Sequence, residues 1–299
     1  MPTRFLVTGK TGQLGTWLVR RLTADADSVL VRATGREDLD LANPPTMKKV
    51  FEGLAGGPPD VLVNAAAFTA VDRCESEEEL ALRVNAESPR KLARACREAG
   101  VRMVHVSTDF VFDGRGRKPY DEKAAARPQT AYGRTKLAGE RLVFDEHPDA
   151  LVVRASWVFG PGRNFVRTMI EQAEKRRSGA ISSPLRVVDD QQGRPTYAAD
   201  LAQAILDLVA EQARGIIHVC NDGVASWWGL ARAALDAGGY REVEIEPIRA
   251  SAYERPAPVP MYTVMDCPVA AALGVSLRHW REAVADYVTS PDSPVPGVA

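Results

Sequence analysis

The fold is decided by the stretch Arg4-Phe5-Leu6-Val7-Thr8-Gly9-Lys10-Thr11-Gly12-Gln13-Leu14-Gly15. Residues 4–8 form a short apolar run that predicts a buried strand, and Trp17, Leu18 and Leu22 then recur at helical spacing. Between these segments, the glycines permit a tight turn and a close approach of the backbone to a phosphate group. The free N–H groups at the start of the helix would meet that negative charge. The order strand, glycine turn, helix therefore predicts a dinucleotide-binding unit.

Downstream, segments typical of strands alternate with segments typical of helices. Strands are predicted at 28–31, 61–64, 103–107 and 151–154, and helices around 44–55, 76–99 and 131–147. This alternation predicts an α/β fold with a Rossmann-type doubly wound parallel sheet. In that architecture ligands bind beyond the carboxyl ends of the strands, where Asn64, Thr108 and Trp157 fall.

The domain organisation follows from where the alternation loosens. We expect residues 1–155 to form the dinucleotide-binding domain, with two further strands near 186–188 and 215–221 returning to its sheet. Residues 156–288 are expected to form most of a smaller, partly interleaved substrate lobe. The segment 289–299 is rich in Pro, Ser and Gly, so it is predicted to be a disordered tail.

A possible acid and a cation stand four residues apart in Tyr132-Gly133-Arg134-Thr135-Lys136. On a helix both side chains leave the same face, about one turn apart. A tyrosine is a poor acid or base at neutral pH unless a nearby positive charge stabilises its phenolate. The spacing alone also fits a packed Tyr beside a surface Lys, so its meaning depends on the glycine turn.

Composition excludes several classes of partner. The chain has 299 residues, 45% of them hydrophobic, and a net charge of −1, which predicts no attraction to nucleic acid or to an anionic membrane. It has no apolar run long enough to span a bilayer and no signal peptide, so a cytoplasmic protein is expected. The four cysteines and four histidines show no metal-ligand spacing, and no metal site is predicted.

Several sequence blocks, in order from about Phe5 to Tyr287, resemble the extended short-chain dehydrogenase/reductases and, more narrowly, the dTDP-4-dehydrorhamnose reductase family. Besides the glycine turn, the blocks are 64–72 (Asn-Ala-Ala-Ala-Phe-Thr-Ala-Val-Asp), 107–112 (Ser-Thr-Asp-Phe-Val-Phe), 132–140, 154–159 and 190–196. The resemblance implies NAD(P)H-dependent reduction of the 4-keto group of a dTDP-4-dehydro-6-deoxyhexose. For this family the expected reaction converts dTDP-4-dehydro-L-rhamnose to dTDP-L-rhamnose.

The resemblance also implies roles for particular residues. Tyr132 would supply a proton to the substrate oxygen, Lys136 would hold the nicotinamide ribose and lower the pKa of Tyr132, and Thr108 would donate a hydrogen bond to the same oxygen. The residues expected to bind substrate are Val71, Thr108, Asp109, Phe110, Trp157 and Arg255. Trp157 could instead fill the seam between the two lobes, and Arg255 could be a surface arginine. Phe110 stands where the family usually has a tyrosine.

NADPH is the expected cofactor, with NADH as an alternative. No acidic residue ends the second predicted strand to grip a ribose 2′-hydroxyl, whereas Arg32 and Arg36 lie nearby. The resemblance places Asp40 and Leu41 at the adenine. The residues expected to bind the cofactor are Gly9, Thr11, Gly12, Gln13, Leu14, Gly15, Arg36, Asp40, Leu41, Ala65, Ala66, Ala67, Tyr132 and Lys136.

Two other functions share these features. A 4-ketoreductase for another dTDP-deoxysugar, of the kind used in antibiotic biosynthesis, would have the same catalytic residues. The regulatory subunit of S-adenosylmethionine synthetase has this fold and binds a nicotinamide cofactor without catalysis. The joint presence of Thr108, Tyr132 and Lys136 argues for an enzyme. The oligomeric state is left open, a homodimer included.

Overall fold

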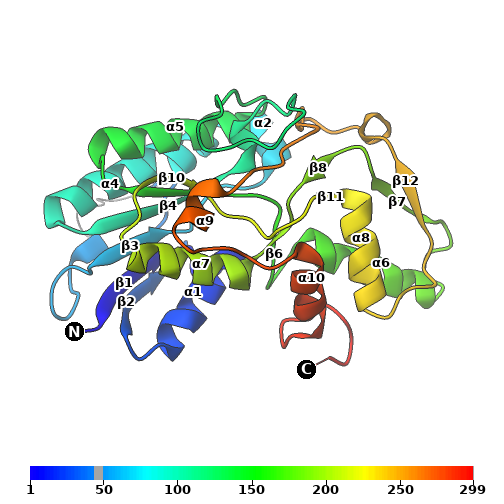
Figure 1. Ribbon diagram of the computed structural model, residues 1–299, viewed down its shortest axis with the longest axis horizontal. Helices are drawn as coiled ribbons and strands as arrows, with labels where there is room; N and C mark the ends of the chain where they lie inside the picture. The colour runs from blue at the N-terminus through cyan, green and yellow to red at the C-terminus, as the bar shows by residue number, and fades with distance from the viewer. Residues whose placement is uncertain (44–49, 299) are drawn as a thin grey trace.

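A six-stranded parallel sheet forms the centre of the computed structural model, which describes residues 1–43 and 50–298 (Figure 1). The strand order is β10-β5-β4-β3-β1-β2, and every neighbouring pair is parallel. The strands are β1 (Thr3–Thr8), β2 (Ser28–Thr34), β3 (Val61–Asn64), β4 (Arg102–Thr108), β5 (Leu151–Ala155) and β10 (Gly215–His218). The predicted doubly wound parallel sheet is confirmed.

The order of the strands reverses beside β1. The chain first places β2 on one side of β1 and then β3 on the other, from which β4 and β5 continue outward. Loops that leave β1 and β3 therefore diverge to opposite faces and open a crevice between them. Such a switch point is where doubly wound sheets bind ligands.

Two layers of helices cover the sheet, as Figure 1 shows. On one face Leu14, Leu18 and Leu22 pack with Leu201 and Leu208. On the other face a second buried cluster contains Leu92, Cys96 and Val143. The helices concerned are α1 (Gln13–Ala24) and α7 (Ala198–Ala210) on the first face, and α4 (Ser88–Ala99) and α5 (Ala131–Glu146) on the second. The inner strands β1, β3, β4 and β5 are largely buried between them, as expected for a parallel sheet.

The segment between β3 and α4 is made of short pieces. The predicted helix at 76–99 is divided into α2 (Val71–Ser76), α3 (Glu78–Leu82), a π-helical turn η2 (Arg83–Glu87) and α4. The turn packs closely on α5, because a Cβ at Gly139 would lie 2.1 Å from the Asn85 carbonyl oxygen. Of the helix predicted around 44–55, residues 44–49 lie outside the described part of the chain.

The second lobe has its own small core. Phe159, Tyr197, Trp280 and Tyr287 are almost fully buried there. Its elements are β6 (Val158–Phe159), α6 (Phe165–Arg177), β7 (Leu185–Val188), β8 (Gln192–Gly193), β9 (Thr196–Tyr197), β11 (Ala225–Ser226), α8 (Trp227–Ala237), β12 (Ile245–Ile248) and α10 (Trp280–Thr289). The remaining short helices are η3 (Asp109–Val111), η4 (Ala250–Ala252) and α9 (Pro268–Ala272).

One expectation for the second half of the chain is wrong. The strand at 186–188 does not return to the central sheet: it is β7, which pairs in parallel with β12. Leu185 and Val187 bury their side chains in the core of the second lobe beside Ile170, while β10 takes the place next to β5. The strand predicted near 215–221 is that β10.

The C-terminal segment, for which the sequence predicted disorder from 289 onward, makes contacts with the rest of the described chain. Asp292 forms an ion pair with Arg20, and its carbonyl accepts a hydrogen bond from Arg167 at 3.0 Å. Val295 packs against the core of the second lobe. One charge and one apolar side chain thus anchor a stretch whose composition is otherwise that of a free tail. No helix in the described part of the chain is long and apolar enough to cross a membrane.

Candidate functional site

A cleft of about 890 Å³ lies at the carboxyl ends of the central strands. It is lined by nearly all of the residues that the sequence singled out. The predicted residues that line it are Gly9, Thr11, Gly12, Gln13, Leu14, Arg36, Asp40, Leu41, Ala65, Ala66, Ala67, Val71, Thr108, Asp109, Phe110, Tyr132, Lys136, Trp157 and Arg255. Gly15 does not line it, because it packs inside the turn, where a Cβ would lie 1.9 Å from the Gly9 oxygen.

The glycine turn forms one wall of the cleft. Gly9 has a φ of +78°, which a glycine adopts without strain, and its backbone N–H donates to the Thr34 carbonyl at 2.8 Å. A Cβ at Gly9 would lie 2.8 Å from the Ala66 nitrogen, so the turn is wedged against the segment after β3. The N-cap of α1, Gly12, offers its helix no side-chain hydrogen bond. The first N–H groups of α1 are therefore free to hold an anion such as a pyrophosphate.

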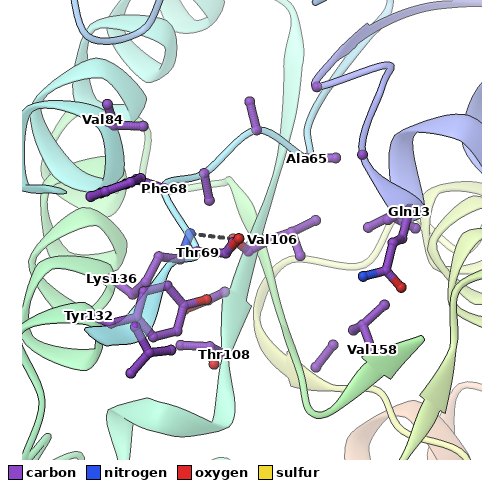
Figure 2. Close-up of a pocket in the computed structure, with 18 of the residues that line it drawn as sticks. Gln13, Ala65, Phe68, Thr69, Val84, Val106, Thr108, Tyr132, Lys136 and Val158 are labelled. Atoms are coloured by element: carbon purple, nitrogen blue, oxygen red, sulfur yellow. Dashed lines mark hydrogen bonds between the residues drawn. The ribbon is translucent and has the colours of Figure 1, made fainter. Parts of the chain in front are cut away.

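Tyr132 and Thr108 are brought to the opposite wall by a close contact between α5 and η3 (Figure 2). A Cβ at Gly133 would lie 2.1 Å from the Phe110 carbonyl oxygen, so only glycine lets the two backbones meet there. The Thr130 hydroxyl caps α5 by accepting from the Gly133 N–H at 3.0 Å. Gly133 thus has a structural reason to stand between Tyr132 and Lys136.

Lys136 lies fully buried at the floor of the cleft. Its Nζ donates to the Val106 carbonyl at 2.7 Å, the dashed line of Figure 2, and lies 3.4 Å from His105 Nε2. Burial lowers the pKa of Lys136 to about 8, while Glu140 acts in the opposite direction. The lysine is therefore a cation that titrates within one or two units of neutral pH.

The phenol of Tyr132 has a raised pKa in this structure. Burial is the main cause, and a hydrogen bond with Thr108 acts in the opposite direction. The sequence predicted that Lys136 would lower this pKa, but in this structure the effect of burial dominates and the pKa is raised. The ring of Phe110 packs edge-on against Tyr132, with centroids 5.5 Å apart. The phenol is therefore protonated at neutral pH, and stabilisation of its phenolate by a positive charge is needed before it can give up that proton.

Below Lys136, a buried ion pair joins α5 to β5. Arg154 donates to Glu140 through Nε at 2.9 Å and Nη2 at 2.6 Å, and both side chains are at most 3% exposed. The Ser107 hydroxyl donates to the same carboxylate at 2.5 Å. Glu140 therefore links α5, which carries Tyr132 and Lys136, to β5 through Arg154 and to β4, which ends in Thr108, through Ser107.

Asp109 brings a second buried carboxyl group into the cleft. Its Oδ1 accepts from the Thr108 hydroxyl at 3.1 Å, whereas its Oδ2 is buried without a hydrogen-bond partner among the described residues. Burial raises the pKa of Asp109 to about 7, against the effect of the hydrogen bond from Thr108. An unpartnered buried oxygen at this place is available to a polar group of a ligand.

The rim carries paired but exposed charges. Arg36 Nε lies 3.7 Å from Asp40 Oδ1, and its side chain is 81% exposed. Arg255 donates to Asp72 through Nε at 3.0 Å and Nη2 at 3.1 Å. Arg32 does not reach the cleft as the sequence suggested, because its guanidinium donates to backbone carbonyls at 50 and 52.

Trp157 both lines the cleft and packs between elements. Its backbone φ is +45°, uncommon for a residue with a side chain, and its ring stacks on Trp227 with centroids 3.7 Å apart. A Cβ at Gly193 would lie 2.4 Å from the Trp157 ring. The two readings left open by the sequence, a ligand wall and a packing residue, are therefore compatible.

Sequence reasoning missed several residues of the cleft. Trp227, Arg163, Phe68 and Arg73 all line it. Trp227 and Arg163 come from the second lobe, where no motif marks them. In residues 1–43 and 50–298, no group of three or more His, Cys, Asp or Glu side chains is arranged to hold a metal ion.

A doubly wound sheet whose glycine turn faces a buried threonine, tyrosine and lysine is the arrangement of a dinucleotide-dependent reductase. A family model described as RmlD substrate binding domain matches residues 3–292. The chain belongs to this family.

Individual relatives match over nearly the whole chain. The dTDP-4-dehydrorhamnose reductase of Mycobacterium tuberculosis (strain ATCC 25618 / H37Rv) is 38% identical over 296 residues, which cover 96% of this chain and 93% of the relative. The dTDP-4-keto-6-deoxy-D-glucose reductase of Streptomyces niveus is 38% identical over 287 residues, covering 95% and 96%. The solved dTDP-4-dehydrorhamnose reductase of Bacillus anthracis, in complex with NADP, superimposes with a TM-score of 0.88 at 31% identity, covering 96% and 99%. The chain is thus similar to catalysts, and the alternative of a non-catalytic regulatory subunit is set aside.

Proposed function

We propose that this protein uses NADPH to reduce the 4-keto group of a dTDP-4-dehydro-6-deoxyhexose, with dTDP-4-dehydro-L-rhamnose as its substrate. The observation that carries the proposal is the burial of Thr108, Tyr132 and Lys136 in one cleft with the glycine turn. The names of the relatives supply the class of sugar nucleotide. The reductase from Bacillus anthracis, solved with NADP, supports the choice of cofactor.

The residues present fit a dinucleotide. The free N–H groups at the start of α1 suit its pyrophosphate, and Gln13 Oε1 beside them is buried without a hydrogen-bond partner in the described part of the chain. Arg36 stands after β2, on the side where a 2′-phosphate would be held. When bound, NADPH supplies the hydride that goes to the carbonyl carbon.

The chain's own residues would handle the carbonyl oxygen. As negative charge develops there, the Tyr132 phenol gives its proton, and the Thr108 hydroxyl stabilises the charge by hydrogen bonding. Lys136 offers a positive charge beside the phenol and N–H groups for the ribose hydroxyls. Asp109 Oδ2 is free to accept from, or when protonated donate to, a polar group of the sugar.

Phe110 supports a second candidate substrate. A phenylalanine there presents an apolar edge to the cleft, where a tyrosine would place a hydroxyl. That change would suit a sugar with a different pattern of hydroxyl groups, such as the 4-keto sugar named for the relative from Streptomyces niveus.

The proposal is tested by offering the purified protein both sugar nucleotides with NADPH. We expect loss of the dihydronicotinamide absorbance with dTDP-4-dehydro-L-rhamnose, and dTDP-L-rhamnose as the product by NMR. Faster turnover of dTDP-4-keto-6-deoxy-D-glucose would replace the substrate by the second candidate. Turnover of neither sugar by a protein that binds NADPH would overturn the proposal.

A further inference from the structure

Four buried polar side chains contact one another in sequence at the floor of the cleft and beneath it. They are Thr8 at the end of β1, Asn64 at the end of β3, His105 on β4 and Lys136 on α5, and none is more than 1% exposed. The Thr8 hydroxyl donates to Asn64 Oδ1 at 2.6 Å, and Asn64 Nδ2 lies 3.0 Å from His105 Nδ1. The far ring nitrogen, Nε2, lies 3.4 Å from Lys136 Nζ.

The orientation of the Asn64 amide is fixed by a group that can only donate a hydrogen bond. The backbone N–H of Ala66 donates to Asn64 Oδ1 at 3.3 Å. A backbone N–H has no acceptor role, so the amide oxygen must face it. The amide nitrogen therefore faces His105, and because that nitrogen only donates, His105 Nδ1 must accept.

This fixes the tautomer of the imidazole. A neutral histidine has one N–H and one acceptor nitrogen, so an accepting Nδ1 leaves the proton on Nε2. Burial, together with the charge of Lys136, holds the pKa of His105 well below its usual range, so the ring is neutral. Its single N–H then points toward a lysine that, when charged, also has only donors.

We propose that Asn64 holds His105 in the Nε2–H tautomer, and that this N–H positions Lys136. Because an N–H group cannot accept a hydrogen bond, the lysine ammonium finds no acceptor on the side that faces His105. The ammonium has three N–H groups, of which one is taken by the Val106 carbonyl at 2.7 Å. The other two are turned toward the cleft, where Tyr132 and the cofactor ribose would be met. His105 is thus a positioning residue, and the inference rests on the role proposed for Lys136.

The same contact affects the charge of the lysine. A neutral Lys136 amine could accept from His105 Nε2–H, whereas an ammonium cannot, so the contact favours the neutral form. Glu140 on α5 favours the charged form, but Arg154 on β5 already pairs with that carboxylate. Tyr132, one turn earlier on α5, is the other titratable neighbour, and Asp109 on η3 acts on Tyr132. Loss of the His105 N–H should therefore let Lys136 keep its proton to higher pH.

The tautomer can be read directly in the unaltered protein. Long-range ¹H–¹⁵N correlation spectra of protein labelled with ¹⁵N-histidine distinguish Nε2–H, Nδ1–H and charged rings. We expect the Nε2–H pattern for His105 at neutral pH, with its signals identified by their loss in His105→Asn or, should that variant not fold, by elimination with variants of His147, His218 and His279. An Nδ1–H or doubly protonated pattern would overturn the inference, whether or not the protein is a reductase.

A variant tests the effect on Lys136. His105→Asn keeps a short acceptor for Asn64 and removes the N–H that faces the lysine. The pH at which NADPH binding is half lost should move upward, with the low-pH affinity preserved. His147→Asn, whose ring nitrogen contacts the Val101 carbonyl away from the cleft, should leave this midpoint in place. A folded His105→Asn protein with an unshifted midpoint contradicts the inference, while failure of substrate turnover alone contradicts only the proposed function.

Discussion

The charged side chains on the floor of the cleft are buried, whereas those on its rim are exposed. On the floor, Lys136 and the pair Glu140–Arg154 are at most 3% exposed and are fixed by several hydrogen bonds. On the rim, the pairs Arg36–Asp40 and Arg255–Asp72 have side chains 30–81% exposed. Buried charges are weakly screened and costly to leave unpaired, whereas exposed pairs contribute little. The floor is therefore built for one geometry, and the rim can exchange its partners for ligand groups.

Tyr132→Phe, on the wall beside Lys136, should give the largest effect on turnover. Removal of the phenol proton should lower kcat by about 100- to 10,000-fold, since this is the usual contribution of a general acid. The NADPH dissociation constant should stay near that of the wild type, because Lys136 and the glycine turn are untouched. Tyr120→Phe, which removes a phenol bound to Asp113 outside the cleft, is the control and should keep its turnover. A near-wild-type rate for Tyr132→Phe would show that another group supplies the proton.

Breaking a floor pair should destabilise the protein far more than breaking a rim pair. Arg154→Met leaves Glu140 buried and unpaired, which should lower the free energy of unfolding by about 3–5 kcal/mol. Arg36→Met, the matched change at the rim, should lower it by ~0–1 kcal/mol. Urea denaturation measures both. Equal losses would remove the distinction between floor and rim.

The floor should also set a pH limit on cofactor binding. The pKa of Lys136 is lowered to about 8, so the lysine is charged below that pH and neutral above it. Affinity for NADPH should therefore be retained at lower pH and fall as pH rises through about 8, by no more than ~10-fold per pH unit for one titrating group. Fluorescence titration across this range gives the profile. Lys136→Met should flatten it, and a wild-type profile without this limb would assign the cofactor contact to another residue.

The smallest effect is expected at the rim, from Arg36→Ala. Loss of an exposed cation near the 2′-phosphate should narrow the preference for NADPH over NADH by about 0.2–1 kcal/mol. The ratio of the two dissociation constants, measured at low salt, reports it. A wild-type protein that already prefers NADH would contradict this role of Arg36.

The central sheet was predictable because its signals are local. The glycine turn follows β1 directly, and each apolar strand run is short and bounded, so the parallel order followed from alternation alone. The pairing of 186–188 with β12, away from the central sheet, was not predictable, since Leu185 and Val187 fit any buried strand and β12 lies about 60 residues away. In the tail, Asp292 forms an ion pair with Arg20, and composition cannot reveal such a contact.

Tyr132 and Lys136 were likewise marked in the sequence by motif and spacing. Trp227 and Arg163 were not, because they reach the cleft from the second lobe through tertiary packing. The ion pair of Arg255 with Asp72 joins residues 183 positions apart. Contacts of that range carry no periodicity, so their partners can be read only from the folded chain.

In the proposed function, this cleft directs a hydride from NADPH to the 4-keto carbon of a dTDP-linked sugar. The most direct measurement uses NADPH that carries deuterium at the transferring position of the nicotinamide, with dTDP-4-dehydro-L-rhamnose as substrate. The account predicts dTDP-L-rhamnose with the deuterium on C4 of the sugar, detected by mass spectrometry and NMR. Product without deuterium, or deuterium at another carbon, would contradict it.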